Sequence, residues 1–526
     1  MPPINVAIIG AGLSGLTALK QCRSDGIPAT IFEARDGIGG QWRYEEPDAE
    51  TGHAMSSMYE GVILNSCRDT STFSDFPIDP ARYPDYFSHR RFLRYIEDYA
   101  DNFKLRPYVR LNTKVLSCKP QEDGKWLVTR QENGKEEIEE VFDAVLACSG
   151  HVSRPLIPKF EGMETFKGQI LHSHVYRRPG TFEGKRVAII GFGSSAADIS
   201  CEIGSQAKEL HVITRRGGWV LPRYAFGKPI EAYDSRIAET VLPQWLTQWA
   251  QTKICETVVG KLPDVIKPAH GIFQANVTVR SDLVESIKTG RVTPHRAGVE
   301  KITEDSIVLT DGTMLEVDAI ICCTGYHMDF PYLPQEIYHV KDNPTLDSPN
   351  SLDLYKLVVS PRFKNLFFIG FVELPGPIVP VSEVQARWAT AIILKNVRLP
   401  SVKEMEESIK SYQEHIAKTM VRSDRHTINV RYLPYCDDLL QELGAAPTFK
   451  KLLLNFLTSN TLEAASLLLA VYFGINSPAQ YRLFGYGKKT QLAKTTLLRL
   501  WRGGKELTTE ERKLARPLPW PESRPS

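Results

Sequence analysis

Short apolar runs, each followed by glycines and a helix-compatible segment, mark the start of the chain. The run Asn5 to Ile9 (NVAII) and a second run that ends at Glu33 (ATIFE) show no regular alternation of apolar and polar positions. Such runs are typical of strands that are buried on both faces of a parallel sheet. Because a helix-compatible segment up to Arg23 lies between them, the pattern predicts a strand–helix–strand unit.

The same pattern recurs further along the chain. The apolar run Val187 to Ile190 is followed by glycines and by a helix-compatible segment toward Ile203. The next run, ELHVITRR, ends at Arg215 and Arg216. The sequence therefore predicts a second unit of the same kind.

The first unit carries the G-x-G-x-x-G spacing of a dinucleotide-binding loop. Gly10 permits a tight turn, Gly12 lets the backbone approach a pyrophosphate, and Gly15 allows the helix and the strand to pack closely. The pyrophosphate then binds backbone N–H groups at the helix N-terminus. Glu33 lies 23 residues after Gly10, close to the spacing at which an acid accepts the ribose hydroxyls. We assign FAD to this unit, with binding residues Gly10, Ala11, Gly12, Leu13, Ser14, Gly15 and Glu33.

The second unit differs from the first in the charge at the end of its second strand. An acid there would repel a ribose 2′-phosphate, whereas the guanidinium groups of Arg215 and Arg216 can bind it bidentately. A solvated surface pair is the alternative role for these two arginines. We assign NADPH to this unit, with binding residues Gly191, Gly193, Ser194, Ser195, Ala196, Ala197, Asp198, Arg215 and Arg216.

Two such units predict an α/β fold with two Rossmann-like domains, the NADPH domain being inserted in the FAD domain. Strand-like runs at Asp143–Ser149 and Asp318–Cys323 lead into glycine turns, and we expect the chain to cross between the domains there. The expected boundaries are 1–158 and 326–445 for the FAD domain, 159–325 for the NADPH domain with a helical insert at about 229–275, and 446–526 for a mostly helical C-terminal segment.

Composition narrows the class of protein. A chain of 526 residues is long enough for several packed domains, and its formal net charge of +2 gives no electrostatic footprint for nucleic acid. The most apolar late stretch, Ala464 to Phe473, is far shorter than the roughly 20 residues that span a bilayer. The nine cysteines are odd in number and show no zinc-binding spacing. We expect a soluble, cytoplasmic protein in a reducing compartment, without a metal.

The cysteines also bear on where the electrons go. A disulfide reductase would carry a redox pair soon after its FAD loop, yet no cysteine lies between Gly37 and Ser66, and Cys67 has no partner within ten residues. Cys322 and Cys323 are adjacent on a strand-like run, where successive side chains point to opposite faces. We expect both to be buried packing residues.

Several further segments make the chain recognisable. They are GIGGQW (Gly37–Trp42), LNSCRDTSTFSDFP (Leu64–Pro77), the pattern F-x-G-x-x-x-H-x-x-x-Y at Phe166, Gly168, His172 and Tyr176, CTGY (Cys323–Tyr326), FFIGFVELPGPIVPVSEVQARW and SPAQYRLFGYG. In this order, beside two dinucleotide motifs, they resemble the flavin-containing monooxygenases, which are class B flavoprotein monooxygenases. Cysteine stands where the family has the alanine of A-T-G-Y, and the hydrophobic C-terminal helix of some animal members has no counterpart.

The resemblance implies a reaction of the N,N-dimethylaniline monooxygenase type. NADPH reduces FAD, dioxygen adds to the reduced flavin as a C4a-hydroperoxide, and a soft nitrogen or sulfur nucleophile such as an amine or thioether takes the distal oxygen. It adds Gly40, Gln41, Trp42, Leu64, Asn65, Thr324 and Gly325 to the expected cofactor-binding residues.

Asn65 is the residue that we expect to be catalytic. An amide offers donors and an acceptor without a titratable proton, so it can hold a peroxide oxygen or the nicotinamide without protonating an intermediate. For His172 and Tyr176, a structural role in the linker between the domains is at least as probable as a catalytic one.

Three functions compete at this point. The first is the N- or S-oxygenase, and the second is a Baeyer–Villiger monooxygenase acting on ketones, whose version of the fingerprint typically ends in tryptophan where this chain has Tyr176. The third is a redox sensor without oxygenase activity or a flavin-binding interaction protein, either of which would predict a degraded site, whereas both glycine motifs and Asn65 are intact. A homodimer and peripheral association with membranes stay open.

Overall fold

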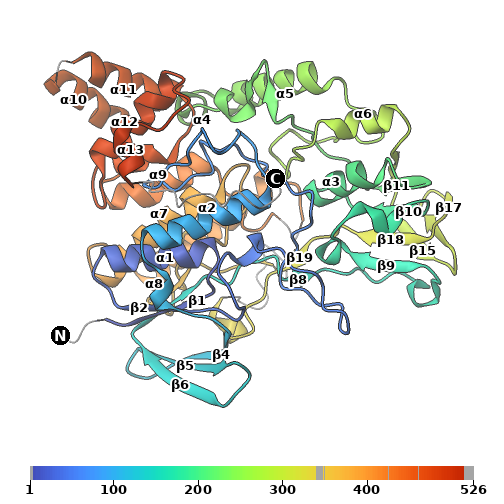
Figure 1. Cartoon of the computed structure of the whole chain (residues 1–526), viewed down its shortest axis with the longest axis horizontal. Helices are drawn as coiled ribbons and strands as arrows, with labels where there is room; N and C mark the ends of the chain where they lie inside the picture. Colours follow the sequence, from blue (N-terminus) through green and yellow to red (C-terminus); the bar gives the residue numbers. More distant parts are fainter. Residues whose placement is uncertain (1–3, 339–347, 349, 424–425, 460, 515–526) are drawn as a thin grey trace.

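Two five-stranded parallel sheets organise the computed structural model, which describes residues 4–338, 348, 350–423, 426–459 and 461–514. Their strand orders are β20-β7-β1-β2-β3 and β14-β11-β10-β18-β9. In each sheet a strand–glycine turn–helix–strand unit occupies the centre, and Figure 1 shows the two sheets side by side.

The first sheet draws its strands from both ends of the chain. They are β1 (Val6–Ile9), β2 (Ala29–Phe32), β3 (Val109–Arg110), β7 (Ala144–Ala147) and β20 (Leu366–Phe368). The helices of this half are α1 (Leu13–Ser24), α2 (His89–Asn102), α7 (Ile378–Ile393), α8 (Val402–Thr419) and α9 (Tyr432–Glu442). An antiparallel sheet adds β4 (Thr113–Pro120), β5 (Trp126–Glu132) and β6 (Glu137–Phe142). All four residues of β1 and of β7 are buried, as expected for strands covered on both faces.

The second sheet is built from the middle of the chain. Its strands are β9 (Gln169–His172), β10 (Arg186–Ile190), β11 (Glu209–Ile213), β14 (Thr293–His295) and β18 (Ala319–Cys322). It is accompanied by α3 (Ser194–Ile203), α6 (Asp282–Lys288) and the antiparallel strands β15 (Val299–Ile302), β16 (Ser306–Leu309) and β17 (Met314–Glu316). Cys322 and Cys323 are both buried and join different apolar clusters, so their expected role in packing on opposite faces is confirmed.

The two chain crossings lie against each other. β8 (Arg154–Pro155) pairs antiparallel with β19 (Tyr326–His327). Both follow a glycine in the left-handed region, Gly150 at φ 77° and Gly325 at φ 90°. This paired linker joins the two sheets where the pattern of strands and glycine turns placed the crossings.

The insert after β11 is mostly helical between Ile230 and Val259. It contains β12 (Tyr224–Ala225), β13 (Lys228–Pro229), α4 (Arg236–Thr240) and α5 (Gln244–Val259). The expectation of a helical insert to about residue 275 is wrong beyond α5, because Gly260 has φ +85° and Pro263 and Pro268 follow, which interrupt helices.

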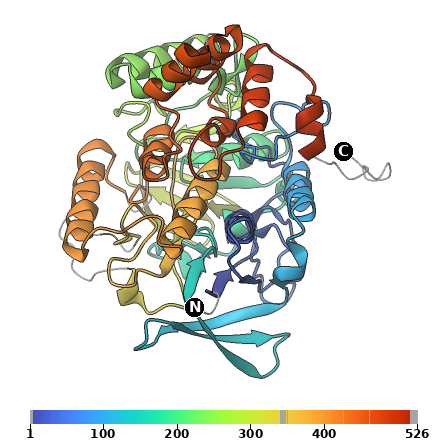
Figure 2. The ribbon, with the colours of Figure 1, turned by 90° about the vertical axis from the view of Figure 1, so that its left-hand side faces the viewer.

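The C-terminal segment packs four helices next to this insert. They are α10 (Phe449–Ser459), α11 (Leu462–Phe473), α12 (Thr490–Trp501) and α13 (Thr509–Leu514). α11 contacts α4, and Figure 2 shows the C-terminal helices at the same end of the molecule as the insert. Short 3-10 helices lie at Gly40–Trp42, Arg106–Tyr108, Met163–Thr165, Ser173–Val175, Pro179–Phe182, Ile230–Tyr233, Gln335–Ile337 and Pro478–Arg482. In the described part of the chain, every helix is too short or too polar to cross a bilayer.

Candidate functional site

The loop after β1 has a backbone that only glycine can supply at two positions. Gly10 has φ +102°, and a Cβ there would lie 2.8 Å from the carbonyl oxygen of Cys148 at the end of β7. A Cβ on Gly15 would lie 1.9 Å from the carbonyl oxygen of Gly10. The turn is therefore pressed against the neighbouring strand, and α1 begins directly behind it with its N–H groups directed at the loop.

The second glycine segment of the first half faces this loop. A Cβ on Gly40 would lie 2.8 Å from Cα of Gly12, and a Cβ on Gly12 would lie 3.6 Å from Cα of Gly40. Backbone meets backbone here, without side chains between, as the approach of a pyrophosphate requires. In the same turn Gln41 donates to Ser57 Oγ, and the ring of Trp42 packs edge-on against Phe92 at 4.5 Å.

Glu33 points its carboxylate back at the same loop. Its Oε2 accepts a hydrogen bond from the Ala11 N–H at 2.6 Å, and Oε1 accepts from the Arg35 N–H at 2.9 Å. The side chain is only 6% exposed, and burial raises its pKa against the opposing effect of these N–H donors and Arg35. An anionic acceptor beside the phosphate loop fits the ribose of FAD.

The loop after β10 repeats this geometry. Gly191 has φ +120°, and a Cβ there would lie 2.3 Å from the carbonyl oxygen of Cys323, which follows β18. Ala196 and Ala197 are buried in the first turn of α3. Asp198 is engaged elsewhere, because its carboxylate accepts from Tyr59 Oη at 2.7 Å and from Arg280 at 3.3 Å. The structure thus directs Asp198 toward a fold contact and leaves the backbone of the loop for the nucleotide.

Arg215 and Arg216 lie just beyond β11, which ends at Ile213, three residues before the end of the predicted run ELHVITRR. Both are exposed. Arg216 donates to the carbonyl oxygen of Arg422 at 2.9 Å, whereas Arg215 makes no hydrogen bond or ion pair with any residue that the structure describes. Arg215 is therefore the better placed of the two to take a phosphate.

A cavity of about 470 Å³ brings part of the predicted site together. Among the predicted residues, those that line it are Asn65, Gly193, Ser194, Ser195, Ala196 and Gly325. The FAD loop and Glu33 lie outside it, at the end of β1 and β2. Thr324 also turns away, since its hydroxyl donates to the carbonyl oxygen of Leu156.

Asn65 is exposed to this cavity and is held by one cation. Its Oδ1 accepts from Arg223 Nη2 at 3.1 Å, and the same guanidinium donates to the carbonyl oxygens of Ile63 and Leu64 at 3.3 Å. Leu64 itself is buried and fixes the turn through its N–H to the carbonyl oxygen of Phe87 at 3.0 Å. With Oδ1 occupied by Arg223, the amide N–H groups of Asn65 are the part that can donate to a ligand.

The fingerprint residues hold the linker. Tyr176 is buried and its hydroxyl donates to Glu202 at 2.8 Å on α3. The Nδ1 of His172 accepts from the His174 N–H at 3.0 Å, and burial lowers the pKa of His172 to about 4. A neutral imidazole that accepts at Nδ1 carries its proton on Nε2, and this ring packs edge-on against Tyr326, a cavity residue, at 5.3 Å.

The residues that complete the cavity come partly from segments without a motif and partly from a stretch that resembles the family. Gln251 and Ile254 come from α5, and Glu373 to Gly376 come from the segment that leads into α7. Arg223, the partner of Asn65, follows an unremarkable Leu-Pro pair. Only the segment around Glu373 lay within a stretch that resembled the family.

Comparisons with known proteins agree over nearly the whole chain. A family model described as flavin-binding monooxygenase-like matches residues 4–517. Flavin-containing monooxygenase 5 of Homo sapiens is 36% identical, with 98% of this chain and 93% of the relative covered. The N-oxide-forming dimethylaniline monooxygenase 2 of Rattus norvegicus is 34% identical, with 98% and 92% covered.

Solved structures show the same fold. The S-allyl-L-cysteine S-oxygenase from Allium sativum matches with a TM-score of 0.62 at 27% identity, over 83% of this chain and 88% of that one. A cyclohexanone monooxygenase matches with a TM-score of 0.60 at 19% identity, over 84% and 98%, which shows the fold alone. The α/β fold class with two dinucleotide-binding domains is thereby confirmed.

The family match over residues 4–517, the curated relatives and the two glycine loops lead to one conclusion. The chain belongs to the flavin-containing monooxygenase family and is an oxidoreductase that uses FAD and NADPH.

Proposed function

We propose that the cavity between Asn65 and the loop after β10 is where a nitrogen or sulfur nucleophile is oxygenated. The observation that carries this proposal is the lining. It combines apolar side chains such as Leu221, Ile254 and Phe273 with the carboxyl groups of Glu231, Asp234 and Glu373, and no lysine or arginine lines it among the described residues. Such a lining favours an apolar amine or thioether over an anionic substrate.

The chain contributes binding, orientation and exclusion of water. A bound FAD would supply the redox chemistry, namely acceptance of a hydride from NADPH and transfer of one oxygen atom of O2 to the substrate, with the other released as water. The loops at Gly10 and Gly191 position the two nucleotides through backbone N–H groups. Asn65 donates to a ligand atom without offering a titratable proton, and the apolar walls keep water from the reacting atoms.

One assay tests the proposal. The holoenzyme, with NADPH and air, is offered a tertiary amine, a thioether and a cyclic ketone, and the products are identified by mass. We expect an N-oxide or a sulfoxide formed in proportion to the NADPH consumed. A lactone from the ketone, with no product from the other two, would replace the proposal by the Baeyer–Villiger alternative. NADPH consumption that yields only hydrogen peroxide with all three would contradict an oxygenase acting on these classes.

The setting of the enzyme belongs to the same proposal. We place it in the cytoplasm, as a monomer or homodimer that acts on a small molecule with O2. Gel filtration with light scattering measures the mass in solution, and fractionation of the native cells measures the compartment.

A further inference from the structure

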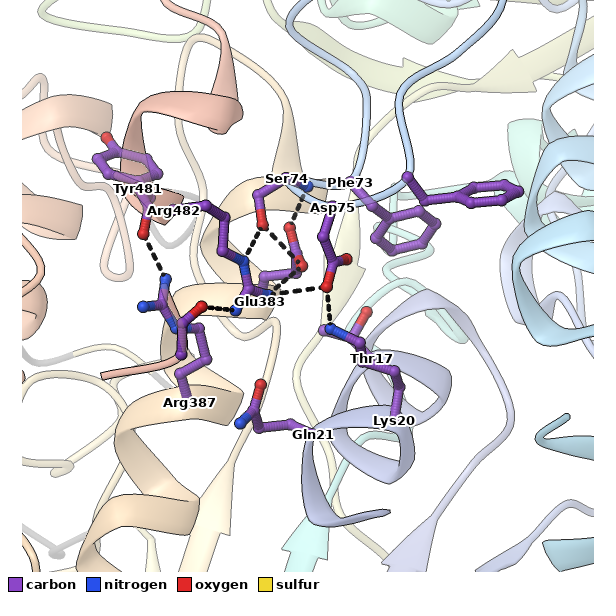
Figure 3. A network of polar contacts seen from close by, with 12 residues as sticks. Thr17, Lys20, Gln21, Phe73, Ser74, Asp75, Glu383, Arg387, Tyr481 and Arg482 are labelled. Atoms are coloured by element: carbon purple, nitrogen blue, oxygen red, sulfur yellow. Dashed lines mark hydrogen bonds and ion pairs between the residues drawn. The ribbon is translucent and has the colours of Figure 1, made fainter. Parts of the chain in front are cut away.

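A buried arginine from the C-terminal segment reaches into the FAD-binding half. Arg482 closes the 3-10 helix Pro478–Arg482 and is 2% exposed. Its Nη2 donates to Glu383 of α7 at 3.0 Å, and its Nε donates to Ser74 Oγ at 2.6 Å. Figure 3 shows the guanidinium between these two partners. One side chain thus ties the C-terminal segment to α7 and to the turn that contains Ser74.

The same turn is bound to α1. Asp75 is fully buried, and its carboxylate contacts Lys20 of α1, Lys489 at 2.7 Å and Arg482 at 3.6 Å. Burial would raise the pKa of Asp75, but these three cations hold it well below its usual value. Burial lowers the pKa of Lys20 to about 8. The turn is therefore joined to α1 and to the C-terminal segment mainly through the buried charges of Lys20, Asp75 and Arg482.

α7 connects the contacts of Arg482 to the phosphate loop after β1. Ser382, next to Glu383, lies with its Oγ 3.2 Å from that of Ser14, the second residue of α1. Three residues after Ser382, the side-chain oxygen of Gln385 accepts the N–H of Gly370 at 2.7 Å, and a Cβ on Gly370 would lie 2.2 Å from Ser14 Oγ. The N-terminal turn of α1 is thus packed against the part of α7 that Arg482 holds.

From these contacts we infer that Arg482 is a positioning residue for FAD. The C-terminal segment uses it to fix α7 and the Ser74–Asp75 turn against α1, and through Ser14 this junction keeps the phosphate loop in its binding geometry. Without Arg482, the Glu383 carboxylate stays buried and loses its cation, which is costly, and α7 shifts relative to α1. FAD then dissociates from a chain that is still folded.

The test measures flavin release apart from unfolding. Holoenzymes of wild type, Arg482→Met and Arg482→Lys are diluted, and the rise of free-flavin fluorescence is followed below the unfolding temperature, which circular dichroism reports. We expect FAD loss at least about tenfold faster in Arg482→Met, since a buried pair is broken, and an intermediate rate in Arg482→Lys. The Michaelis constant for NADPH stays at the wild-type value.

A matched control lies in the same segment. Arg499 is also buried and pairs with Glu511 at 3.0 Å, between α12 and α13. Arg499→Met breaks a comparable pair away from α1 and α7, so it lowers the thermal midpoint while FAD leaves only on unfolding. Equal rates of flavin release in Arg499→Met and Arg482→Met would overturn the inference.

A double variant tests whether the effect passes through Glu383. Replacing Glu383 by Gln removes the carboxylate that Arg482→Met leaves unpaired, so Arg482→Met/Glu383→Gln should release FAD more slowly than Arg482→Met alone. Additive acceleration in the double variant would contradict the route through α7. If Arg482→Met does not fold, Arg482→Lys decides the outcome, because it keeps the charge. Flavin release from Arg482→Lys at the wild-type rate would then overturn the inference.

Discussion

The two dinucleotide-binding units share a backbone and differ in the charge beside it. In both, the first glycine has a φ in the left-handed region, +102° at Gly10 and +120° at Gly191. In both, a Cβ there would strike the carbonyl oxygen of a cysteine after the neighbouring strand, Cys148 or Cys323. The same turn thus stands at the end of the central strand of each sheet, and we propose that it binds the pyrophosphate that the two nucleotides have in common.

We propose that the residues after the second strand select between the two nucleotides. In the first unit Glu33 is buried and bonded to the loop, whereas in the second unit Arg215 is exposed and without a partner among the described residues. A buried acceptor suits ribose hydroxyls, and an exposed guanidinium suits a phosphate that retains water. On this proposal, the shared backbone geometry sets the class of ligand, a dinucleotide, and one charged position sets which dinucleotide is bound.

The largest effect is expected from a substitution at Gly12, in the first unit. Its Cα faces Gly40 with no side chain between, so the methyl groups of Gly12→Val would fill the space that the pyrophosphate needs. We expect a folded, colourless protein on purification, measured by the ratio of flavin to protein absorbance. Gly180→Val, at an exposed position with no atom within 4 Å of the added Cβ, should stay yellow. Full flavin occupancy in Gly12→Val would refute the assignment of the first loop.

The next largest effect is expected from a substitution at Arg215, in the second unit. Hydrogen bonds to a charged group contribute roughly 1.5–3 kcal/mol, about a ten- to hundredfold preference, with solvent favouring the lower end. Arg215→Ala should raise the Michaelis constant for NADPH by that factor and leave NADH almost unchanged. Arg216→Ala should do less, because Arg216 already donates to Arg422, and the double variant should do most. Steady-state kinetics with both nucleotides decides; equal use of NADH by the wild type would place the phosphate elsewhere.

The geometry of the glycine loops could be predicted from sequence because each loop depends on local spacing, whereas the ligand assigned to each loop stays a prediction. Gly10, Gly15 and Gly191 are required by contacts within one strand–turn–helix unit and its neighbour. Arg223 and Arg482 could not be predicted, since their partners Asn65 and Glu383 lie 158 and 99 residues away. Part of the cavity lining could not be predicted for the same reason, because α5 and the segment before α7 reach the cavity through tertiary packing.

A substitution at Asn65 tests whether oxygenation takes place in the cavity that Asn65 shares with the loop after β10. Asn65→Asp should leave FAD bound but lower the product formed per NADPH, with hydrogen peroxide rising to match. Arg223 lies 3.1 Å away and would neutralise part of the new charge, so the loss should be several-fold, on the order of one hydrogen bond or about 1 kcal/mol. Asn65→Asp/Arg223→Gln, without that cation, should lose more. Unchanged product per NADPH in both variants would leave Asn65 with a structural role.

The smallest effect is expected at Ala196, where the two units differ in their third small residue. The first unit requires glycine, because a Cβ on Gly15 would lie 1.9 Å from the Gly10 carbonyl oxygen. The second unit accommodates the methyl group of Ala196, which is only 1% exposed. Ala196→Gly removes that buried methyl and loosens the first turn of α3, at a cost of about 1 kcal/mol, or about 2 °C in the thermal midpoint. The Michaelis constant for NADPH should stay within about twofold, since the backbone N–H groups remain.

Gly15→Ala is the counterpart in the first unit, and it should lose FAD. Circular dichroism measures the thermal midpoint of both variants, and absorbance measures their flavin content. A Gly15→Ala protein with wild-type flavin content would show that close packing is not the reason why this position requires glycine.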